Sequence, residues 1–203
     1  MGIRPGLHHF PPVSMNNLFP VFLKIEHLQT LVVGGGNVGL EKANALLSNA
    51  PGAPITLVAP EIRAELVTLA EQHPNFSLIY DSYAPDYLEN SDLVIVATND
   101  KAVNAQVQTD CKNRRILVNV ADTPDLCDFY LSSVVKKGDL KIAISTNGKS
   151  PTFAKRFREI LEEILPDSLQ DTLNNLQSIR NRLKGDFQEK VERLNEITKI
   201  MKP

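Results

Sequence analysis

The chain has 203 residues, 42% of them hydrophobic, which is enough to bury a core in one large domain or one and a half. A net charge of −2 gives no overall positive field, so neither nucleic acid nor an anionic membrane is expected as a partner. Two cysteines, Cys111 and Cys127, are too few for a disulfide framework or a structural zinc site. No apolar run approaches the length of a membrane span, and we expect a cytoplasmic protein with reduced thiols.

The first residues, 1–14, are rich in Pro, Gly and His and show no periodicity, which predicts a disordered N-terminal extension. Within it, His8 and His9 are expected to be a solvated pair rather than a metal site. The sequence from Met15 onward reads like the natural start of a protein. The sequence leaves open whether Met1 or Met15 begins the working protein.

The most informative motif follows a β-branched run, Thr30 to Val33, and precedes a helical pattern. It reads Gly34-Gly-Gly-Asn-Val-Gly39, a G-x-G-x-x-G turn between a strand and a helix. Gly34 permits the tight turn, Gly36 lets the backbone approach phosphates, and Gly39 lets the helix pack on the strand. The pattern predicts a pyrophosphate held at a helix N-terminus, and the alternative is a glycine turn that binds nothing.

The next part of the chain alternates short apolar strands with helical patterns. Strands are predicted over 55–59, 76–80, 93–97 and 116–120, helices over 61–73 and 101–113, and a turn or short helix over 85–90. Continuous apolar strands separated by helices indicate a parallel sheet covered on both faces. We therefore predict an α/β fold that begins with a Rossmann-like doubly wound domain.

The pattern then changes. Residues 129–136 and 140–145 read as strands joined by Lys137-Gly-Asp139, which predicts an antiparallel hairpin. From Pro151 the chain reads as helical to its end, with breaks expected at Pro166 to Ser168 and at Gly185. The apolar stripes of these helices must be covered, by the rest of the subunit or by another copy, and packing alone is the favoured role.

In an open parallel sheet, ligands bind beyond the carboxyl ends of the strands. After the second strand come Pro60 and Glu61. Glu61 is the nearest candidate to bind the adenosine ribose, and the backbone around Pro60 could bind it instead. The alternative role of Glu61 is that of an acidic residue in the first turn of the following helix. Arg63 could accept the extra phosphate of NADP, but NAD is preferred.

The fourth strand delivers Thr98, Asn99 and Asp100, and the fifth delivers Asn119 and Asp122. All are expected to border one crevice. A carboxylate at Asp122 could take a proton while hydride leaves to the cofactor, or could ligate a divalent metal. Its alternative role is a turn or helix-cap aspartate ahead of a proline.

Taken together, these motifs resemble the dehydrogenase/ferrochelatase module of siroheme synthases. The matching segments run in order from about Met15 to the C-terminus: Phe19–Leu23, Val32–Gly39 with Lys42, Thr56–Pro60, Ala97–Asp100, Asn119–Asp122, Phe129–Lys137 and Leu140–Pro151.

The resemblance implies NAD-dependent oxidation of precorrin-2 to sirohydrochlorin in a homodimer. In some members the same site also inserts ferrous iron to give siroheme, and the sequence leaves open whether this chain does. It also implies NAD contacts from Gly34, Gly36, Asn37, Val38, Gly39, Pro60, Glu61, Thr98 and Asn99. Asp122 matches the family aspartate tied to dehydrogenation and chelation, and so is both the catalytic residue and a candidate metal ligand.

Tetrapyrrole binding is expected at the polar turn after the hairpin and at the basic residues around it. The expected substrate-binding residues are Ser145, Thr146, Asn147, Lys149 and Arg156. Lys136, Lys137, Lys155 and Arg158 belong to the same basic cluster, whose alternative role is an ordinary solvated face.

The expected organisation is an NAD-binding Rossmann domain over 15–122, a hairpin dimerisation and substrate region over 123–155, and a C-terminal helical region over 156–203. Precorrin-2 would come from a separate uroporphyrinogen methyltransferase. An alternative of another class is a non-catalytic NAD-sensing module. Such modules usually carry a clear acid at the end of the second strand, where this chain has Ala59 and Pro60.

Overall fold

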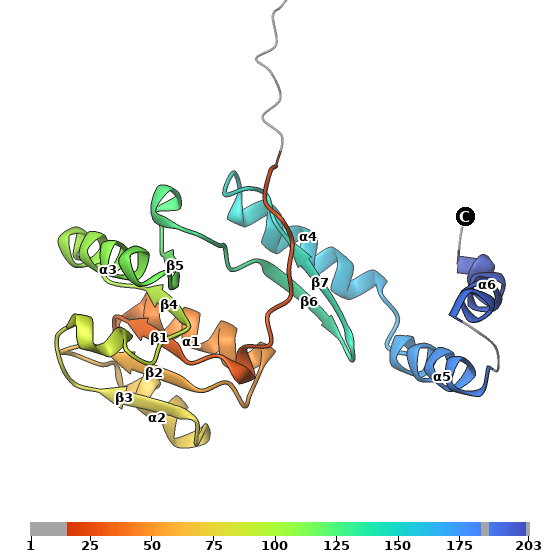
Figure 1. Cartoon of the computed structure of the whole chain (residues 1–203), viewed down its shortest axis with the longest axis horizontal. Coiled ribbons are helices and arrows are strands. Elements are labelled where there is room, and N and C mark those ends of the chain that lie inside the picture. The colour runs from red at the N-terminus through yellow and green to blue at the C-terminus, as the bar shows by residue number, and fades with distance from the viewer. Residues whose placement is uncertain (1–15, 184–186, 202–203) are drawn as a thin grey trace, which may run out of the picture. The chain divides into compact units, whose positions relative to one another are not determined.

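A computed structural model describes residues 16–183 and 187–201 of the chain (Figure 1). The predictions made for residues 1–14, with His8 and His9, and for Gly185 itself lie outside the described residues. The described chain forms two compact units. Residues 19–131 make up the sheet unit, and residues 132–201 with 16–18 make up the hairpin unit.

The sheet unit is built on five parallel strands in the order β3-β2-β1-β4-β5, which confirms the predicted doubly wound sheet. The strands are β1 Thr30–Val33, β2 Ile55–Val58, β3 Phe76–Ile79, β4 Leu93–Val96 and β5 Leu117–Val120. The chain runs outward from β1 to β3 and then crosses to β4, so the strand order reverses between β1 and β4. Ligands of such sheets bind at this reversal.

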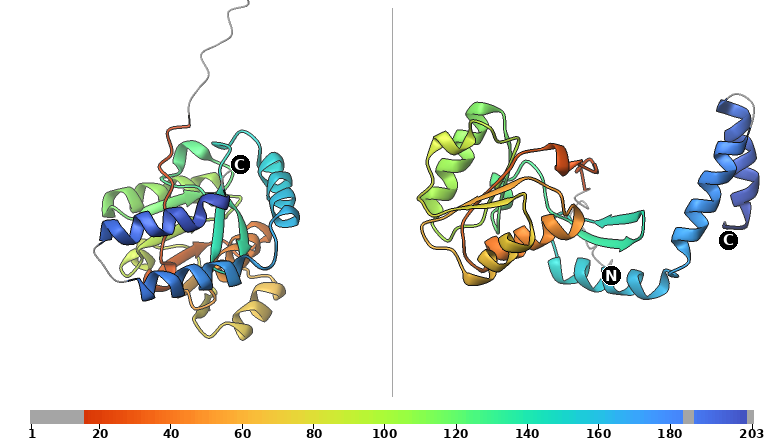
Figure 2. Two further views of the ribbon diagram at one scale, coloured as in Figure 1. Left: turned by 90° about the vertical axis from the view of Figure 1, so that its right-hand side faces the viewer. Right: turned by 90° about the horizontal axis from the view of Figure 1, so that it is seen from below.

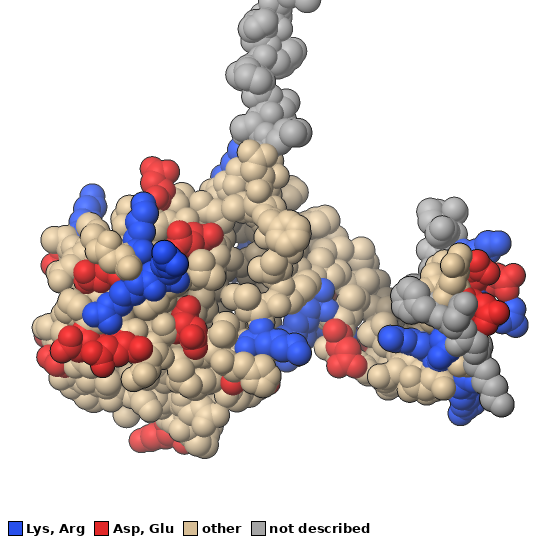
Figure 3. Space-filling model, viewed as in Figure 1, with Lys and Arg blue, Asp and Glu red and all other residues tan. Residues whose placement is uncertain are grey.

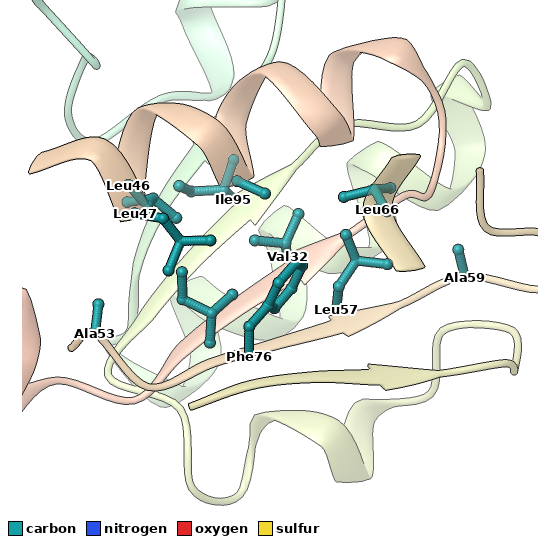
Figure 4. Close-up of a cluster of buried hydrophobic side chains, with 11 residues drawn as sticks. Val32, Leu46, Leu47, Ala53, Leu57, Ala59, Leu66, Phe76 and Ile95 are labelled. Carbon is teal, nitrogen blue, oxygen red and sulfur yellow. The ribbon is translucent and has the colours of Figure 1, made fainter. Parts of the chain in front are cut away.

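Helices cover both faces of the sheet. On one face, α1 (Asn37–Asn49) and α2 (Ala64–Gln72) pack on side chains of the central strands. Figure 4 shows residues of this cluster, which include Val32, Leu57 and Ile95, all 0% exposed. On the other face lie η2 (Pro85–Leu88) and α3 (Lys101–Arg114). Two further 3₁₀ turns, η1 Ile25–His27 and η3 Pro124–Leu126, complete the unit.

The segment after η3 continues the outer edge of β5. The Asp128 amide donates to the Val118 carbonyl at 2.8 Å, and the Asp128 carboxylate accepts from the Val118 amide at 3.0 Å. The buried Asn119 side chain donates to the Phe129 carbonyl at 2.8 Å. Because these contacts hold Phe129 to the sheet unit, the strand predicted from residue 129 begins only at Ser133.

The hairpin unit begins with the predicted antiparallel pair, β6 (Ser133–Lys137) and β7 (Leu140–Ile144). Lys137 pairs with Leu140, which leaves a two-residue turn in which Gly138 has φ 59°. α4 (Pro151–Ile164) packs along β6 (Figure 2), and its first turn is capped by the Ser150 hydroxyl, which accepts from the Phe153 amide at 3.1 Å.

Two further helices follow, α5 (Leu169–Arg182) and α6 (Phe187–Ile197), and α6 runs into η4 (Thr198–Met201). The start of α5 is tied to the hairpin turn. Lys137 pairs with Asp167 at 2.6 Å, and Gln170 accepts from the Asp139 amide at 2.7 Å. Across the described residues, the helices are all too short or too polar to cross a bilayer.

Candidate dinucleotide-binding site

A cleft of about 570 Å³ opens at the carboxyl ends of the strands, where the strand order reverses. Its lining includes every residue predicted to contact the cofactor except Gly39: Gly34, Gly36, Asn37, Val38, Pro60, Glu61, Thr98 and Asn99. Residues that follow β1, β2 and β4 thus come together as the sheet rule predicts.

The glycine turn forms the floor of this cleft. Gly34 has φ +122°, and a Cβ there would lie 2.5 Å from the Ala97 carbonyl oxygen. A Cβ on Gly39 would strike the Gly34 carbonyl oxygen, so this glycine serves helix packing and not the cleft surface. A Cβ on Gly36, in contrast, would meet no atom within 4 Å. Open space therefore lies directly over Gly36.

α1 begins beside this space. Its N-cap is Gly36, which has no side chain to cap the helix, and Asn37 and Val38 at its start line the cleft. A helix N-terminus presents unpaired N–H groups and the positive end of the helix dipole. An uncapped N-terminus with open space before it fits the pyrophosphate of a dinucleotide.

The end of β2 supplies Pro60 and Glu61, both exposed. α2 begins at Ala64, three residues after the predicted start, so Glu61 is not a first-turn helix acid, and that role belongs to Glu65. The Glu65 carboxylate also accepts hydrogen bonds from Nε and Nη2 of Arg63, and this contact raises the pKa of Arg63. Arg63 is therefore paired with Glu65 within the loop.

The end of β4 is held by a small polar network. The Asp100 carboxylate accepts from the amides of Ala102 and Val103, at 2.8 and 3.2 Å, and so caps α3. The Thr98 hydroxyl donates to the Asn104 side chain, whose amide donates to the Thr98 carbonyl at 3.1 Å. These bonds fix the loop and leave the exposed Asn99 facing the cleft.

The end of β3 adds two lining residues that the sequence prediction missed, Ser82 and Tyr83. The Tyr83 hydroxyl donates to Asp110 of α3 at 3.0 Å, and burial together with this bond raises the pKa of Tyr83 well above its ordinary value. The same sheet rule could have found both residues, because they follow the carboxyl end of the predicted third strand.

The end of β5 presents Asp122 in the left-handed backbone region, with φ 57°. Its side chain is exposed and does not line the cleft. Val96 and Val120 are paired at the ends of β4 and β5, and Thr98 and Asp122 each lie two residues further on. The Asp122 backbone is therefore one strand away from the cleft wall, since neighbouring strands lie about 4.8 Å apart.

Asn119 was expected to border the crevice, but it does not. Its side chain is buried and bonded to the Phe129 carbonyl. The Cys127 thiol lies beside it. It donates to the Val120 carbonyl at 3.1 Å and accepts from the Val120 amide at 3.2 Å. Cys127 is thus a half-buried hydrogen-bonding group, whereas Cys111 is fully buried.

The predicted tetrapyrrole-binding residues lie in the hairpin unit, at the turn between β7 and α4. Ser145 accepts from the Asn147 amide at 3.2 Å, and Thr146 accepts from the Ser150 amide at 3.2 Å. Asn147 has φ 55° in the same turn, and Lys149 is exposed. These short-range bonds give the turn a defined shape.

Arg156 projects from α4 with 78% of its side chain exposed, 3.6 Å from Glu159. Two other members of the basic cluster are engaged in closer ion pairs: Lys137 with Asp167, and Arg158 with Glu162 at 2.8 Å. Figure 3 shows acidic and basic side chains interspersed over the visible face of the sheet unit. Within the described residues, no group of three or more His, Cys, Asp or Glu side chains could hold a metal ion.

Comparison with known proteins is consistent with this geometry. A family described as "Putative NAD(P)-binding" matches residues 21–133, more than half of the chain, and one described as "Sirohaem biosynthesis protein central" matches residues 137–164. A solved structure titled "SirC, precorrin-2 dehydrogenase" is 32% identical, with a TM-score of 0.71, and the match covers 89% of each chain. The chain belongs to this siroheme-biosynthesis family of NAD(P)-binding proteins.

Siroheme synthases are similar over most of this chain. The siroheme synthase of Psychrobacter arcticus is 40% identical over 178 residues, which are 88% of this chain and 31% of that protein. The siroheme synthase of Nitrosomonas eutropha is 36% identical over 175 residues, or 86% of this chain and 36% of that protein. The chain thus spans about a third of the length of these curated family members.

Proposed function

We propose that this protein is an NAD-dependent precorrin-2 dehydrogenase that forms sirohydrochlorin in siroheme biosynthesis. The observation that carries the proposal is the cleft at the strand reversal, with an uncapped helix N-terminus and open space over Gly36. Similarity to SirC over 89% of both chains supports the assignment of this cleft to a precorrin-2 dehydrogenase.

NAD rather than NADP fits the charges of the cleft. Among the described residues that line it are two carboxylates, Glu61 and Asp100, and no lysine or arginine. Arg63, two residues after Glu61, is paired with Glu65. A 2′-phosphate near Glu61 would meet like charge without a compensating cation, so NADP binds at least about tenfold more weakly than NAD.

The proposed reaction removes two hydrogens from the tetrapyrrole, one as hydride and one as a proton. When bound, NAD accepts the hydride. Asp122 takes the proton: its carboxylate is exposed at the end of β5, one strand from the part of the cleft lined by Thr98 and Asn99. The left-handed backbone at Asp122 directs the chain away from the strand immediately after this side chain.

Substrate carboxylates are proposed to bind the basic side chains beside the turn of the hairpin unit, with Lys149 and Arg156 as the principal contacts. Replacing each by alanine raises the KM for precorrin-2 and leaves the KM for NAD unchanged. Arg193→Ala on α6, which removes an exposed arginine paired with Glu196, is the matched control. An unchanged precorrin-2 KM in both variants would reject these contacts.

The protein is further proposed to act as a homodimer through α4. Phe153 and Phe157 stack with ring centres 5.9 Å apart, and with Ile160 and Ile164 they form an exposed apolar stripe on this helix. Phe157→Glu would then convert the dimer to a monomer in sedimentation analysis. A monomeric wild-type protein at micromolar concentration would contradict the proposal.

The catalytic assignment is tested with enzymatically generated precorrin-2 and NAD under anaerobic conditions. Asp122→Asn, which keeps the size of the side chain, lowers kcat at least about a hundredfold, in line with the usual contribution of a general base. Its NAD affinity stays at the wild-type value. Asp125→Asn, an exposed aspartate three residues away, retains activity. Equal rates in the two variants would remove Asp122 from the mechanism.

The non-catalytic NAD-sensing alternative is separated by thermal stability. A dehydrogenase is stabilised by sirohydrochlorin as well as by NAD, whereas a sensor responds to the nucleotide alone. Adding ferrous iron after the dehydrogenase reaction tests the chelatase activity, and Asp122→Asn shows whether the same carboxylate serves both steps.

A further inference from the structure

The loop after β3 forms one wall of the cleft. Tyr83 lies in this wall and shares the cleft lining with Pro60 and Val103. Its half-buried side chain also packs against the core cluster between the sheet and α3. Tyr83 therefore contacts both the cleft and the core of the sheet unit.

Two side-chain hydrogen bonds hold this loop. The Tyr83 hydroxyl donates to Asp110 of α3 at 3.0 Å, and the Tyr87 hydroxyl donates to Asp81 at 2.7 Å. Burial and the bond to Asp110 raise the pKa of Tyr83. Since the hydroxyl is bonded to α3, the ring is the part of Tyr83 that remains to meet a ligand.

The order of groups along the cleft shows which part of a dinucleotide reaches Tyr83. In the proposed site the pyrophosphate lies over Gly36, where there is open space, and the adenosine ribose lies at Glu61, which lines the cleft. The adenine base follows the ribose, toward the end of β3, where Pro60, Tyr83 and Val103 provide apolar surface. A flat heterocycle packs well against an aromatic ring and aliphatic groups.

We infer that Tyr83 holds the adenine base of the dinucleotide, and that Asp110 is a positioning residue that acts on adenine only through Tyr83. This inference rests on the proposed dinucleotide site and adds to it a specific determinant of adenine affinity. A ring fixed before the ligand arrives loses little conformational freedom on binding.

The test measures the affinities of AMP, which contains adenine, and of nicotinamide mononucleotide, which lacks it. Tyr83→Leu keeps an apolar side chain but removes the aromatic face. Its Kd for AMP and NAD rises about 5- to 150-fold, the range that aromatic stacking of a base contributes, and its Kd for nicotinamide mononucleotide is unchanged. Tyr83→Phe keeps the ring but loses its anchor, and weakens AMP binding about two- to fivefold.

The role of Asp110 is tested by a double-mutant cycle. Asp110→Ala removes the acceptor of the Tyr83 hydroxyl. It weakens AMP binding as much as Tyr83→Phe does, and has no further effect in the Tyr83→Phe background. These two variants leave the aromatic ring in place and keep the test decisive if Tyr83→Leu fails to fold. Additive effects of Asp110→Ala and Tyr83→Phe would overturn the positioning role.

A folded Tyr83→Leu protein whose Kd for AMP stays within twofold of wild type would overturn the adenine assignment. An equal rise in the Kd values for AMP and nicotinamide mononucleotide would also overturn the adenine assignment, because it indicates general damage to the cleft. If the wild-type protein binds neither AMP nor NAD, the proposed dinucleotide site itself is wrong, and that outcome is distinct from a failure of Tyr83 alone.

Discussion

Replacing Gly36 with alanine should abolish tight dinucleotide binding while leaving the fold intact. Gly36 has φ −86°, which alanine adopts without strain, and the added methyl group would meet no protein atom within 4 Å. Gly→Ala at such a position stabilises a protein by about 0.4–1 kcal/mol through the unfolded chain. For a chain of this size, the melting temperature stays the same or rises by up to about 4 °C.

The same methyl group occupies the open space that the pyrophosphate needs. Loss of one charge-assisted hydrogen bond between an amide of the glycine turn and a phosphate costs about 1.5–3 kcal/mol, or about 10- to 150-fold in the Kd for NAD. Isothermal titration calorimetry with NAD measures this change, and differential scanning fluorimetry without ligand measures the stability.

Gly34→Ala is the matched contrast. Its φ of +122° and the Ala97 carbonyl oxygen 2.5 Å from the new Cβ force the backbone to move. Backbone strain alone costs about 1–3 kcal/mol, and with the steric contact we expect about 3 kcal/mol or more, which lowers the melting temperature by about 6 °C or more. Wild-type NAD affinity in Gly36→Ala, or wild-type stability in Gly34→Ala, would refute this interpretation of the turn.

Three further outcomes test the fold around the cleft. Leu57→Ala, at a fully buried position of β2, lowers the free energy of unfolding by about 2–5 kcal/mol in urea titrations. Asp100→Ala removes the cap of α3 and costs about 1 kcal/mol in the same assay. The Tyr87 hydroxyl and the Ser82 amide hold the pKa of Asp81 below its ordinary value, so its stabilising effect is present above about pH 4 and is lost as the pH falls through the lowered pKa. Asp81→Asn should therefore be less stable than wild type at neutral pH, and acid titration should close this difference; a difference that persists at the lowest pH would contradict the assignment.

The sheet unit was predictable from sequence because its signals are local and periodic. Apolar runs with intervening helical patterns specified five parallel strands, and the glycine spacing specified the turn at Gly34. The rule that ligands bind at the carboxyl ends of strands then selected lining residues of the cleft such as Asn37 and Asn99, although Ser82 and Tyr83 were missed.

Other features depend on contacts between distant segments and were not predictable. Asn119 and Asp122 both come from the fifth strand and were both expected at the crevice. The Asn119 side chain turns inward because the Phe129 carbonyl accepts its hydrogen bond. The same contact delays the start of β6. The role of Tyr83 depends on Asp110, 27 residues away, and no local motif connects the two.

The central claim is tested most directly by measuring NADH and sirohydrochlorin together when the wild-type protein meets precorrin-2 and NAD without oxygen. We expect one NADH for each sirohydrochlorin formed, and at least about tenfold slower turnover when NADP replaces NAD at a limiting concentration. NAD binding without NADH formation would contradict the dehydrogenase assignment and favour a nucleotide sensor.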